Sequence, residues 1–436
     1  MRLPGGPSAR LCIVLLASIH ALPAQADDRR VSELESQLSE QRERIGRLEA
    51  LVDRQTQLIE ALHKVATPIS PSPAPSRSAS PIASRAAPAA EPAGAFRVAG
   101  LDVSGDLRIR EELNWSDAGV RDRARTVFRA RLRAAYRLSD RFAVGGQLTT
   151  GDPDDPNSTD VTLGSFADDL TLSLDQAWLR YQAAGFTAWA GKFPLPFLRT
   201  DMVWDGDVSP QGVGALLSVA LGGGATADAR ALYFAIDEAA GGKDSDMVGG
   251  QAVFAAPLGK DLKLTLAGAY YHYRLRSLAG ADAGDFRSNL ISGGRYLSDF
   301  RLVNAIGVLT WSGLGRRWPV TLTGDYVHNA GSAVSSDSGY NIELSAGRTG
   351  AKGDWRIFYN HSHVGVDAVF AAFSHDNLGI ATHYRLHGLS IEHVPVDNLV
   401  LNATLYHYRP LDLLYAGTNP PHDWLNRLRL NMSVSF

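Results

Sequence analysis

The sequence predicts an all-β transmembrane barrel of about 16 antiparallel strands, preceded by an α-helical coiled coil and a disordered linker. Three observations lead to this fold class. The chain of 436 residues opens with a pattern typical of secretion signals. From about residue 97 onward, apolar and polar side chains alternate over most of its length. Short and long connections follow one another between these alternating segments.

Residues 1–26 have the three parts of a secretory signal peptide. Two arginines supply the positive start, residues 11–19 form a short apolar core, and residues 24–26 (Ala-Gln-Ala) match a small-residue cleavage site. The one cysteine of the chain, Cys12, lies inside this segment. We therefore expect the secreted protein to contain neither a disulfide nor a thiolate metal site.

The charge of the chain argues against nucleic acid as a partner. The formal charge is −3, and removal of the two arginines of the signal segment changes it to −5. Proteins that bind nucleic acid are usually basic, so this class is disfavoured.

Residues 27–66 are predicted to form a periplasmic coiled coil, with heptads counted from Val31. Eight of the ten seam positions are aliphatic, and the other two are glutamines at d positions. The segment RIGRLE at 44–49 resembles a trimerisation pattern in which Arg and Glu pair between helices. We expect a trimer, and a solvated single helix is the alternative.

Residues 67–96 form a linker rich in Pro, Ala and Ser. This composition buries too little apolar surface to fold, so the segment is predicted to be disordered. Fully extended, it would reach on the order of 90 Å, at about 3.1 Å per residue. It would tether the coiled coil to the barrel, or act as a spacer of no specific length.

Residues 97–436 are predicted to form the barrel. Residues 101–113 alternate aliphatic with mostly charged side chains, with Gly105 and Glu111 interrupting the apolar face, and residues 128–138 alternate apolar with mostly arginine side chains. The last segment, ending at Phe436, has one apolar and one polar face. Seven short turns and eight longer loops would join sixteen strands. A sandwich or propeller could also alternate, but the signal, the terminal Phe and the loop asymmetry favour an outer-membrane barrel.

The stretch from Val103 to Gln211 resembles the bacterial putative-porin family. The matching segments include SGDLRIR, LDQAWLRY and WAGKFPLPFLRTDMVWDGDVSPQG, together with the aromatic end of the last strand. They cover most of the first third of the barrel. The resemblance implies a trimeric or otherwise oligomeric outer-membrane pore without catalytic residues. It does not decide which solute passes.

Charged side chains on the polar faces of the first two strands are candidates for lining the pore, because charges at a constriction set selectivity. One interpretation is an arginine–carboxylate ladder that braces the wall. The other is a cationic strip that guides anionic solutes, and both can hold at once. The candidate residues are Arg108, Arg110, Arg125, Arg129, Arg131, Arg133, Arg137, Asp102 and Asp106.

The loop at residues 194–211 is the third long loop of the predicted barrel. We expect it to fold into the lumen as a constriction; a simple external loop is the alternative. Its candidate residues are Arg199, Asp201, Asp205 and Asp207. Carboxylates across the lumen from the arginines would create a transverse field that orients dipolar solutes.

A second loop, at residues 151–169, contains six aspartates. Several carboxylates in one loop could bind Ca²⁺, but the EF-hand spacing and its closing Glu are lacking. We therefore interpret it as a solvated acidic loop.

Ten of the twelve histidines follow residue 270. His361 and His363 share one strand face, and His383 and His387 lie near another; we interpret them as interface residues, not metal ligands. Alternation places Ser362 on the opposite face from its neighbouring histidines, which argues against a hydrolase triad. The sequence predicts no enzyme, no cofactor and no metal site.

Taken together, these patterns predict an outer-membrane porin that forms a water-filled diffusion channel for small hydrophilic solutes and favours anions. A structural tether between outer membrane and cell wall is the alternative. The expected partners are outer-membrane lipid and lipopolysaccharide, further copies of the chain in a homotrimer, the barrel-assembly machinery acting on Phe436, and peptidoglycan within reach of the coiled coil. Nucleic acid is not expected.

Overall fold

The computed structural model describes residues 96–98, 100–117, 122–164, 169–278, 287–412, 414–415 and 423–436. These residues are almost entirely strands and connections, with one short 3-10 turn, η1 (Ala371–Phe373). Among them, no helix has the length and apolar character needed to cross a membrane. The predicted signal peptide (1–26), coiled coil (27–66) and linker (67–96, apart from its last residue) lie outside the described residues and stay predictions.

Sixteen long antiparallel strands form one sheet, which confirms the predicted strand number. The sheet also contains β1 (Phe96–Val98) and β5 (Val161–Thr162), two short additions that pair with β2 and β3. A separate hairpin joins β12 (Ile291–Ser292) to β13 (Arg295–Tyr296). The sixteen strands are β2 (Leu101–Ser116), β3 (Arg123–Arg137), β4 (Phe142–Thr150), β6 (Leu172–Ala183), β7 (Phe186–Lys192), β8 (Gln211–Gly222), β9 (Ala225–Asp237), β10 (Ser245–Pro257), β11 (Leu262–Arg274), β14 (Arg301–Trp311), β15 (Val320–Asn329), β16 (Ser338–Gly347), β17 (Trp355–Val364), β18 (Tyr384–Val396), β19 (Leu399–Pro410) and β20 (Leu425–Ser435).

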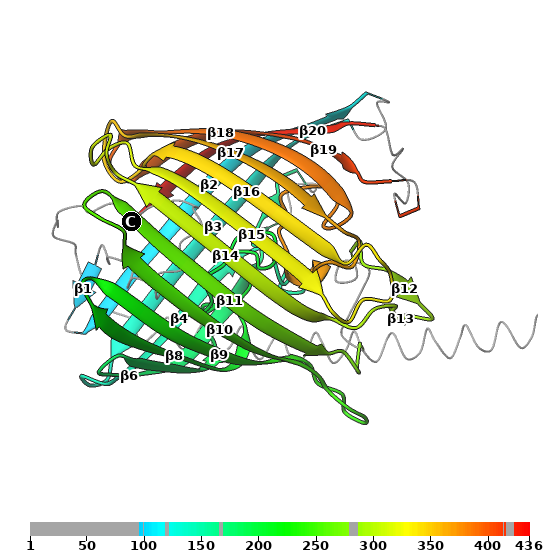
Figure 1. Cartoon of the computed structure of the whole chain (residues 1–436), viewed down its shortest axis with the longest axis horizontal. Coiled ribbons are helices and arrows are strands. Elements are labelled where there is room, and N and C mark those ends of the chain that lie inside the picture. The colour runs from blue at the N-terminus through cyan, green and yellow to red at the C-terminus, as the bar shows by residue number, and fades with distance from the viewer. Residues whose placement is uncertain are drawn as a thin grey trace, which may run out of the picture. The chain divides into compact units, whose positions relative to one another are not determined.

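The barrel closes where the first long strand, β2, pairs with both its successor β3 and the last strand β20. Figure 1 shows the tilted strands around this closed sheet, with red β20 beside cyan β2. The backbone of Phe436 extends the seam by exchanging two hydrogen bonds with Gly105, of 2.9 and 3.0 Å. A Cβ at position 105 would lie 2.4 Å from the Phe436 ring, so only glycine leaves room for this closure.

The exposure of side chains along β2 distinguishes the outer face of the barrel from its inner face. Leu107 and Ile109 are each 43% exposed, whereas Arg108 and Arg110 between them are each 5% exposed. Exposed apolar residues therefore point outward and polar residues inward, as expected of a transmembrane barrel, which has an apolar outer band.

Seven connections lie at one end of the barrel and eight at the other, and most of the eight are longer, as predicted. Porin-type barrels place long loops outside the cell and short turns in the periplasm. The apolar–polar alternation of the sequence is interrupted in two places, near residues 170–174 and near Leu386. The first is a bulge: Asp175 is an extra residue between Leu174 and Gln176, which pair with Leu148 and Gln147. The second has a regular register.

Leu386 breaks the alternation because part of the inner wall is apolar. Leu232, Met247 and Tyr271 point inward and are almost fully buried. Polar residues therefore do not line the barrel interior on this side. These side chains do not meet water because they pack against loops that fold into the interior.

Candidate functional site

Nine of the arginines on the inward faces of three neighbouring strands, β20, β2 and β3, form what we call the arginine wall; Arg123, at the start of β3, is the tenth on these faces. Arg108 stands directly opposite Arg129 in the register of β2 and β3. Like charges in such cross-strand positions are destabilising, so the wall depends on carboxylates brought to it. The arginines are Arg108, Arg110, Arg125, Arg129, Arg131, Arg133, Arg137, Arg427 and Arg429.

Asp106 of β2 binds the arginines in the part of the wall that lies toward the short turns. Its carboxylate accepts hydrogen bonds from Arg129 Nη2 at 3.0 Å, Arg131 Nε at 2.9 Å and Arg133 Nη2 at 3.0 Å. One carboxylate thus holds three guanidiniums of the adjacent strand in fixed positions. This is the bracing ladder that the sequence suggested.

Glu112 plays the same part nearer the long-loop end. Its side chain is completely buried. It forms ion pairs with Arg125 at 2.7 Å and Arg429 at 2.8 Å, and lies 3.6 Å from Arg427. Strands β2, β3 and β20 are therefore joined at the barrel seam by side-chain ion pairs as well as by backbone hydrogen bonds.

The loop after β4 supplies a third carboxylate. Asp160 pairs with both Arg108 and Arg110, the latter at 2.7 Å. The prediction of a solvated acidic loop is therefore wrong for residues near 160, because this loop turns into the barrel and its end, β5, pairs with β3. Within the same loop, burial raises the pKa of Asp155 to about 6.

The loop at 193–210, between β7 and β8, also lies inside the barrel. Asp207 forms an ion pair with Arg131 at 2.8 Å and lies 3.7 Å from Arg129. Burial alone would raise the pKa of Asp207, but Arg131 and Arg129 hold it below its usual range. The expected field across the lumen is thus replaced, at Asp207, by direct contact with the arginine wall.

The other predicted residues of this loop have different surroundings. Asp205 is buried, and burial together with Asp376 and Asp207 raises its pKa well above the usual range. Arg199 donates to Asp201 at 2.7 Å and to the carbonyl of Trp204 at 3.0 Å. Asp205 and this second pair therefore shape the loop itself and make no ion pair with the wall among the described residues.

A third internal loop, at 365–383 between β17 and β18, was not anticipated. Arg429 Nη1 donates to Asn377 Oδ1 at 2.7 Å, and Arg427 Nη1 donates to the Asn377 carbonyl at 2.9 Å. Asp376 lies 4.0 Å from Arg429. Burial alone would raise the pKa of Asp376, but Arg429 and Arg110 lower it.

The three internal loops also bind one another. Asn157 Nδ2 donates to the Ser374 carbonyl at 2.5 Å. The Asp205 amide donates to the Phe373 carbonyl at 2.8 Å. The rings of Trp204 and Phe373 stack with centroids 5.7 Å apart. The loops therefore form one internal assembly, since each contacts at least one of the others.

The opposite side of this assembly rests on the apolar inner wall. Trp204 is fully buried and meets Tyr271 edge-on at 5.5 Å. Gln251 of β10 accepts from the Leu198 amide and donates to its carbonyl, both at 2.7 Å. A Cβ at Gly249 would lie 3.1 Å from Phe197, so this glycine lets the loop approach the wall closely.

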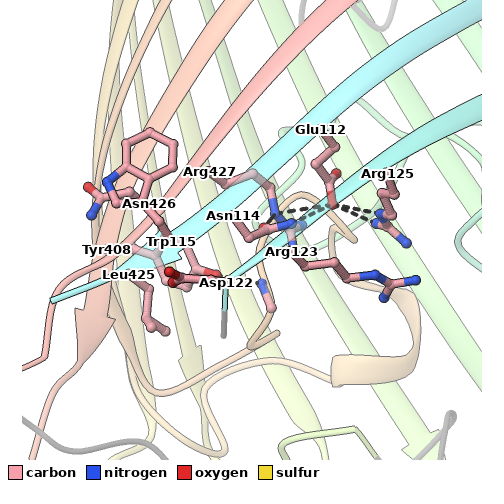
Figure 2. A pocket seen from close by; sticks show the side chains of 11 residues that line it. Glu112, Asn114, Trp115, Asp122, Arg123, Arg125, Tyr408, Leu425, Asn426 and Arg427 are labelled. Atoms are coloured by element: carbon pink, nitrogen blue, oxygen red, sulfur yellow. Dashed lines mark hydrogen bonds and ion pairs between the residues drawn. The ribbon is translucent and has the colours of Figure 1, made fainter. Parts of the chain in front are cut away.

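A pocket of about 480 Å³ opens at the long-loop end of the arginine wall. Its polar lining includes Arg123, Arg125 and Arg427, with Tyr408 and Leu425 as apolar sides. Figure 2 shows Glu112 between Arg125 and Arg427, joined to both by ion pairs. Because this carboxylate is already shared among guanidiniums, the pocket presents an excess of positive charge.

The structure thus brings together most of the residues predicted from the sequence. Arg137 and Asp102 lie toward the short-turn end of β3 and β2, away from the loops. Sequence reasoning did not place Arg427 and Arg429 in the site, although both were visible on the polar face of the last strand. It also missed the 365–383 loop. Its run Val-Asp-Ala-Val-Phe-Ala-Ala-Phe is a signal, because an external loop in water has little reason to be so apolar.

The side chains offer no obvious metal or nucleophile chemistry. No group of three or more His, Cys, Asp or Glu residues among those described is arranged to hold a metal ion. Ser362 points inward and donates to Asn341 Oδ1 at 2.7 Å, away from His361 and His363, as the alternation predicted. The charged side chains of the site are suited to electrostatic attraction of charged solutes.

The family comparison now adds to this geometry. Residues 111–279 match a family model described as "Putative porin". This stretch runs from β2 past the end of β11 and includes most of the arginine wall and the 193–210 loop. Over this stretch the chain is similar to that family. Comparison with curated proteins gives no match.

Solved structures with similar folds are outer-membrane barrels. OprB of Pseudomonas putida has a TM-score of 0.51 at 14% identity, with 77% of this chain and 94% of that chain covered. OmpF of Salmonella typhi has a TM-score of 0.47 at 12% identity, with coverages of 77% and 97%. A mutant porin of Rhodopseudomonas blastica has a TM-score of 0.43 at 11% identity, with coverages of 77% and 100%. At these identities, the similarity to OprB establishes the fold of the porin-type barrel and nothing finer.

Proposed function

We propose that this porin-type barrel is a diffusion channel for small hydrophilic solutes and that it favours anions. The observation that carries the proposal is the charge of the arginine wall. Nine guanidiniums point inward there, and five carboxylates form ion pairs with them: Asp106, Glu112, Asp160, Asp207 and Asp376. Inward-facing cations left over from this pairing attract anions and repel cations.

The path of an anion would begin at the external pocket. Arg123 is exposed at its rim, and Arg125 and Arg427 line its wall. From there it would pass along the arginine wall beside the 193–210 loop, which narrows the lumen and acts as the constriction. Arg133, whose side chain is 31% exposed, would be the last guanidinium of the network that the solute meets.

The wider assembly is also part of the proposal. The predicted coiled coil would hold three barrels together from the periplasmic side and reach toward peptidoglycan. Outer-membrane lipid and lipopolysaccharide would surround each barrel. The barrel-assembly machinery would recognise the last strand and Phe436. No catalytic role is assigned to any residue.

The test is electrical. The full chain, secreted and purified from outer membranes, is inserted into planar bilayers. We expect stepwise openings and, under a KCl gradient, a reversal potential displaced toward that of chloride. Triplet steps would support the trimer. A folded barrel without conductance would contradict the channel and favour the tether, whereas displacement toward potassium would contradict the anion preference alone.

A matched pair of variants sharpens the test. Arg133→Gln removes a half-exposed guanidinium of the wall and should move the reversal potential toward that of potassium. Arg141→Gln removes an exposed arginine in the short turn after β3 and should leave it unchanged. Equal effects of both variants would mean that surface charge, not the arginine wall, sets selectivity.

A further inference from the structure

A second group of basic side chains lies on the outside of the barrel, where the proposed channel has no use for it. His361 of β17, His387 of β18 and His407 of β19 occupy one row across three adjacent strands. They alternate with the buried residues Ser362, Leu386 and Tyr408 and therefore point outward.

A second row lies one step closer to the long loops. His363, Arg385 and Arg409 are register partners on the same three strands. Together the two rows form what we call the external basic patch. Arg385 and Arg409 stand directly opposite each other, and like charges in this position are destabilising when nothing lies between them.

No carboxylate among the described residues forms an ion pair with Arg385 or Arg409. The parts of the neighbouring 411–424 loop that the structure does not describe contain no Asp or Glu in their sequence. Asp423, which precedes the outward Trp424, is buried, and Asp412, the other carboxylate of this loop, lies 3.4 Å from Nε2 of His383. The charge of the patch is therefore not neutralised by its own strands.

Some other outward basic side chains at the long-loop end have a carboxylate partner. Arg274 of β11 donates to Asp246 at 2.5 and 2.7 Å. His328 of β15 lies 3.5 Å from Asp337. Arg301 of β14 forms no ion pair with a described carboxylate and donates to the Ala330 carbonyl at 3.1 Å. What sets the external basic patch apart is that two such guanidiniums, those of Arg385 and Arg409, belong to register partners.

Two imidazoles of the patch, those of His361 and His407, are oriented by hydrogen bonds at Nδ1. The Nδ1 atom of His361 lies 2.9 Å from the Leu386 carbonyl, and that of His407 lies 2.7 Å from Asn426 Oδ1. Both contacts require Nδ1 to carry the proton. Nε2 of His361 also lies 3.5 Å from the Tyr340 hydroxyl, whereas Nε2 of His407 is left for another ligand. A protonated ring could then donate from Nε2 to an anion.

Aromatic and aliphatic side chains frame the patch. The ring of Trp424 stacks on His407 at 3.9 Å, and the guanidinium of Arg409 lies 4.8 Å from the Trp424 ring. Further along the same outward faces, Leu389, Ile391 and Leu405 are exposed. A ligand that contacted both the basic side chains and the exposed apolar side chains would need an anionic headgroup next to apolar chains, at the boundary of the membrane.

We propose that the external basic patch binds the phosphorylated headgroup of an outer-leaflet lipid. The phosphate would lie between Arg385 and Arg409, where it offers several oxygens to two guanidiniums and removes their repulsion. The acyl chains would run down past the exposed leucines. This site depends only on the barrel's place in the outer membrane and not on the proposed channel.

The test uses the folded full chain in detergent and measures binding of synthetic diphosphoryl lipid A by the shift of thermal unfolding with ligand concentration. The same lipid without phosphates and inorganic phosphate alone are the comparison probes. We expect the diphosphoryl lipid to bind more tightly than its dephosphorylated form by about tenfold or more, since each lost charge-assisted contact costs on the order of tenfold. Inorganic phosphate should not stabilise at the same concentrations.

The matched variants are the double substitution Arg385→Gln/Arg409→Gln and the single substitution Arg301→Gln. Arg301 is exposed at the same end of β14, outside the patch. The double variant should lose the preference for the phosphorylated lipid, and the single variant should keep it. If the double variant does not fold, His387→Gln with His407→Gln removes two of the six side chains of the patch and should weaken the preference severalfold.

Three results would overturn the proposal. Equal binding of both lipids would show that phosphate is not recognised. Equal stabilisation by inorganic phosphate would show a site for free anions and not for a lipid. An unchanged preference in the double variant of a folded barrel would place the binding elsewhere.

Discussion

The two sides of the barrel interior hold the same loop assembly by different means. On the arginine wall, Asp160, Asp207 and Asn377 contact guanidiniums through directional hydrogen bonds. On the apolar wall, Trp204 and its neighbours are held by buried area and ring contacts. Apolar burial stabilises the loops without fixing side-chain positions closely. Hydrogen bonds between charged groups fix positions, but much of their favourable energy is offset by the cost of desolvating the charges.

This difference has a functional consequence. Solute can interact with the arginine wall, because several of its guanidiniums keep exposed surface, but not with the apolar wall, which the loops cover. In the proposed channel, the apolar wall would anchor the loops and the arginine wall would set which charged solutes the open part of the lumen attracts. The predictions below separate these two roles, from the largest expected effect to the smallest.

Removing the apolar anchor should have the largest effect. Trp204→Ala leaves a cavity where a fully buried indole packed against Tyr271 and Phe373. The docked state of the loops should lose about 3–5 kcal/mol. Hydrogen exchange of residues 193–210 and single-channel noise should both rise. Trp318→Ala, at an exposed tryptophan in a short turn, is the control and should change neither.

Removing one carboxylate of the arginine wall should have a smaller effect on docking and a clear effect on charge. Asp207→Asn ends the ion pairs with Arg131 and Arg129 and should cost about 2–3 kcal/mol of loop docking. The reversal potential should move further toward that of chloride. Asp201→Asn, whose side chain is 40% exposed, is the matched control. A change in selectivity as large in the control would contradict a special role of the wall.

Acidification should loosen the 365–383 loop. Burial lowers the pKa of His375 to about 3, below the value of about 6.5 expected in the unfolded chain. The folded state therefore binds fewer protons, so its stability is present at neutral pH and is lost as pH falls below about 6.5, by about 1–2 kcal/mol at pH 5. Asp155, with its raised pKa, acts in the opposite direction as pH falls through about 6.

The comparison of wild type with His375→Gln isolates this contribution, because Asp155 is present in both. Loop exchange measured between pH 7 and pH 5 should rise in the wild type and rise less in the variant. His272→Gln, on the outward face of β11, should behave like the wild type. The same pH response in all three proteins would show that protonation of His375 does not loosen the loop.

Salt should have the smallest effect. Most ion pairs between the loops and the arginine wall are buried, and buried pairs are screened little. Raising KCl from about 0.1 to 1 M should weaken loop docking by less than about 1 kcal/mol, measured again by hydrogen exchange. A large increase in exchange of residues 151–160 would mean that these pairs are open to solvent and that electrostatics dominates the anchoring.

Local pattern determined the barrel and much of the arginine wall. Side chains alternate with a period of two along any strand, so a single strand such as β2 already separates Arg108 and Arg110 from Leu107 and Ile109. Loop lengths follow from where this alternation stops. Both are properties of neighbouring residues, and the strand number and the polar face of β3 could therefore be predicted.

Only the tertiary structure decided which partners meet across the lumen. Asp160 reaches Arg110 from 50 positions along the chain, and Asn377 reaches Arg429 from 52. The apolar wall, the inward turn of the 365–383 loop and the outward row of histidines all depend on strands being closed into a ring. Alternation alone tells which residues share a face, but whether that face meets lipid, water or a folded loop depends on distant segments, and no local pattern contains that information.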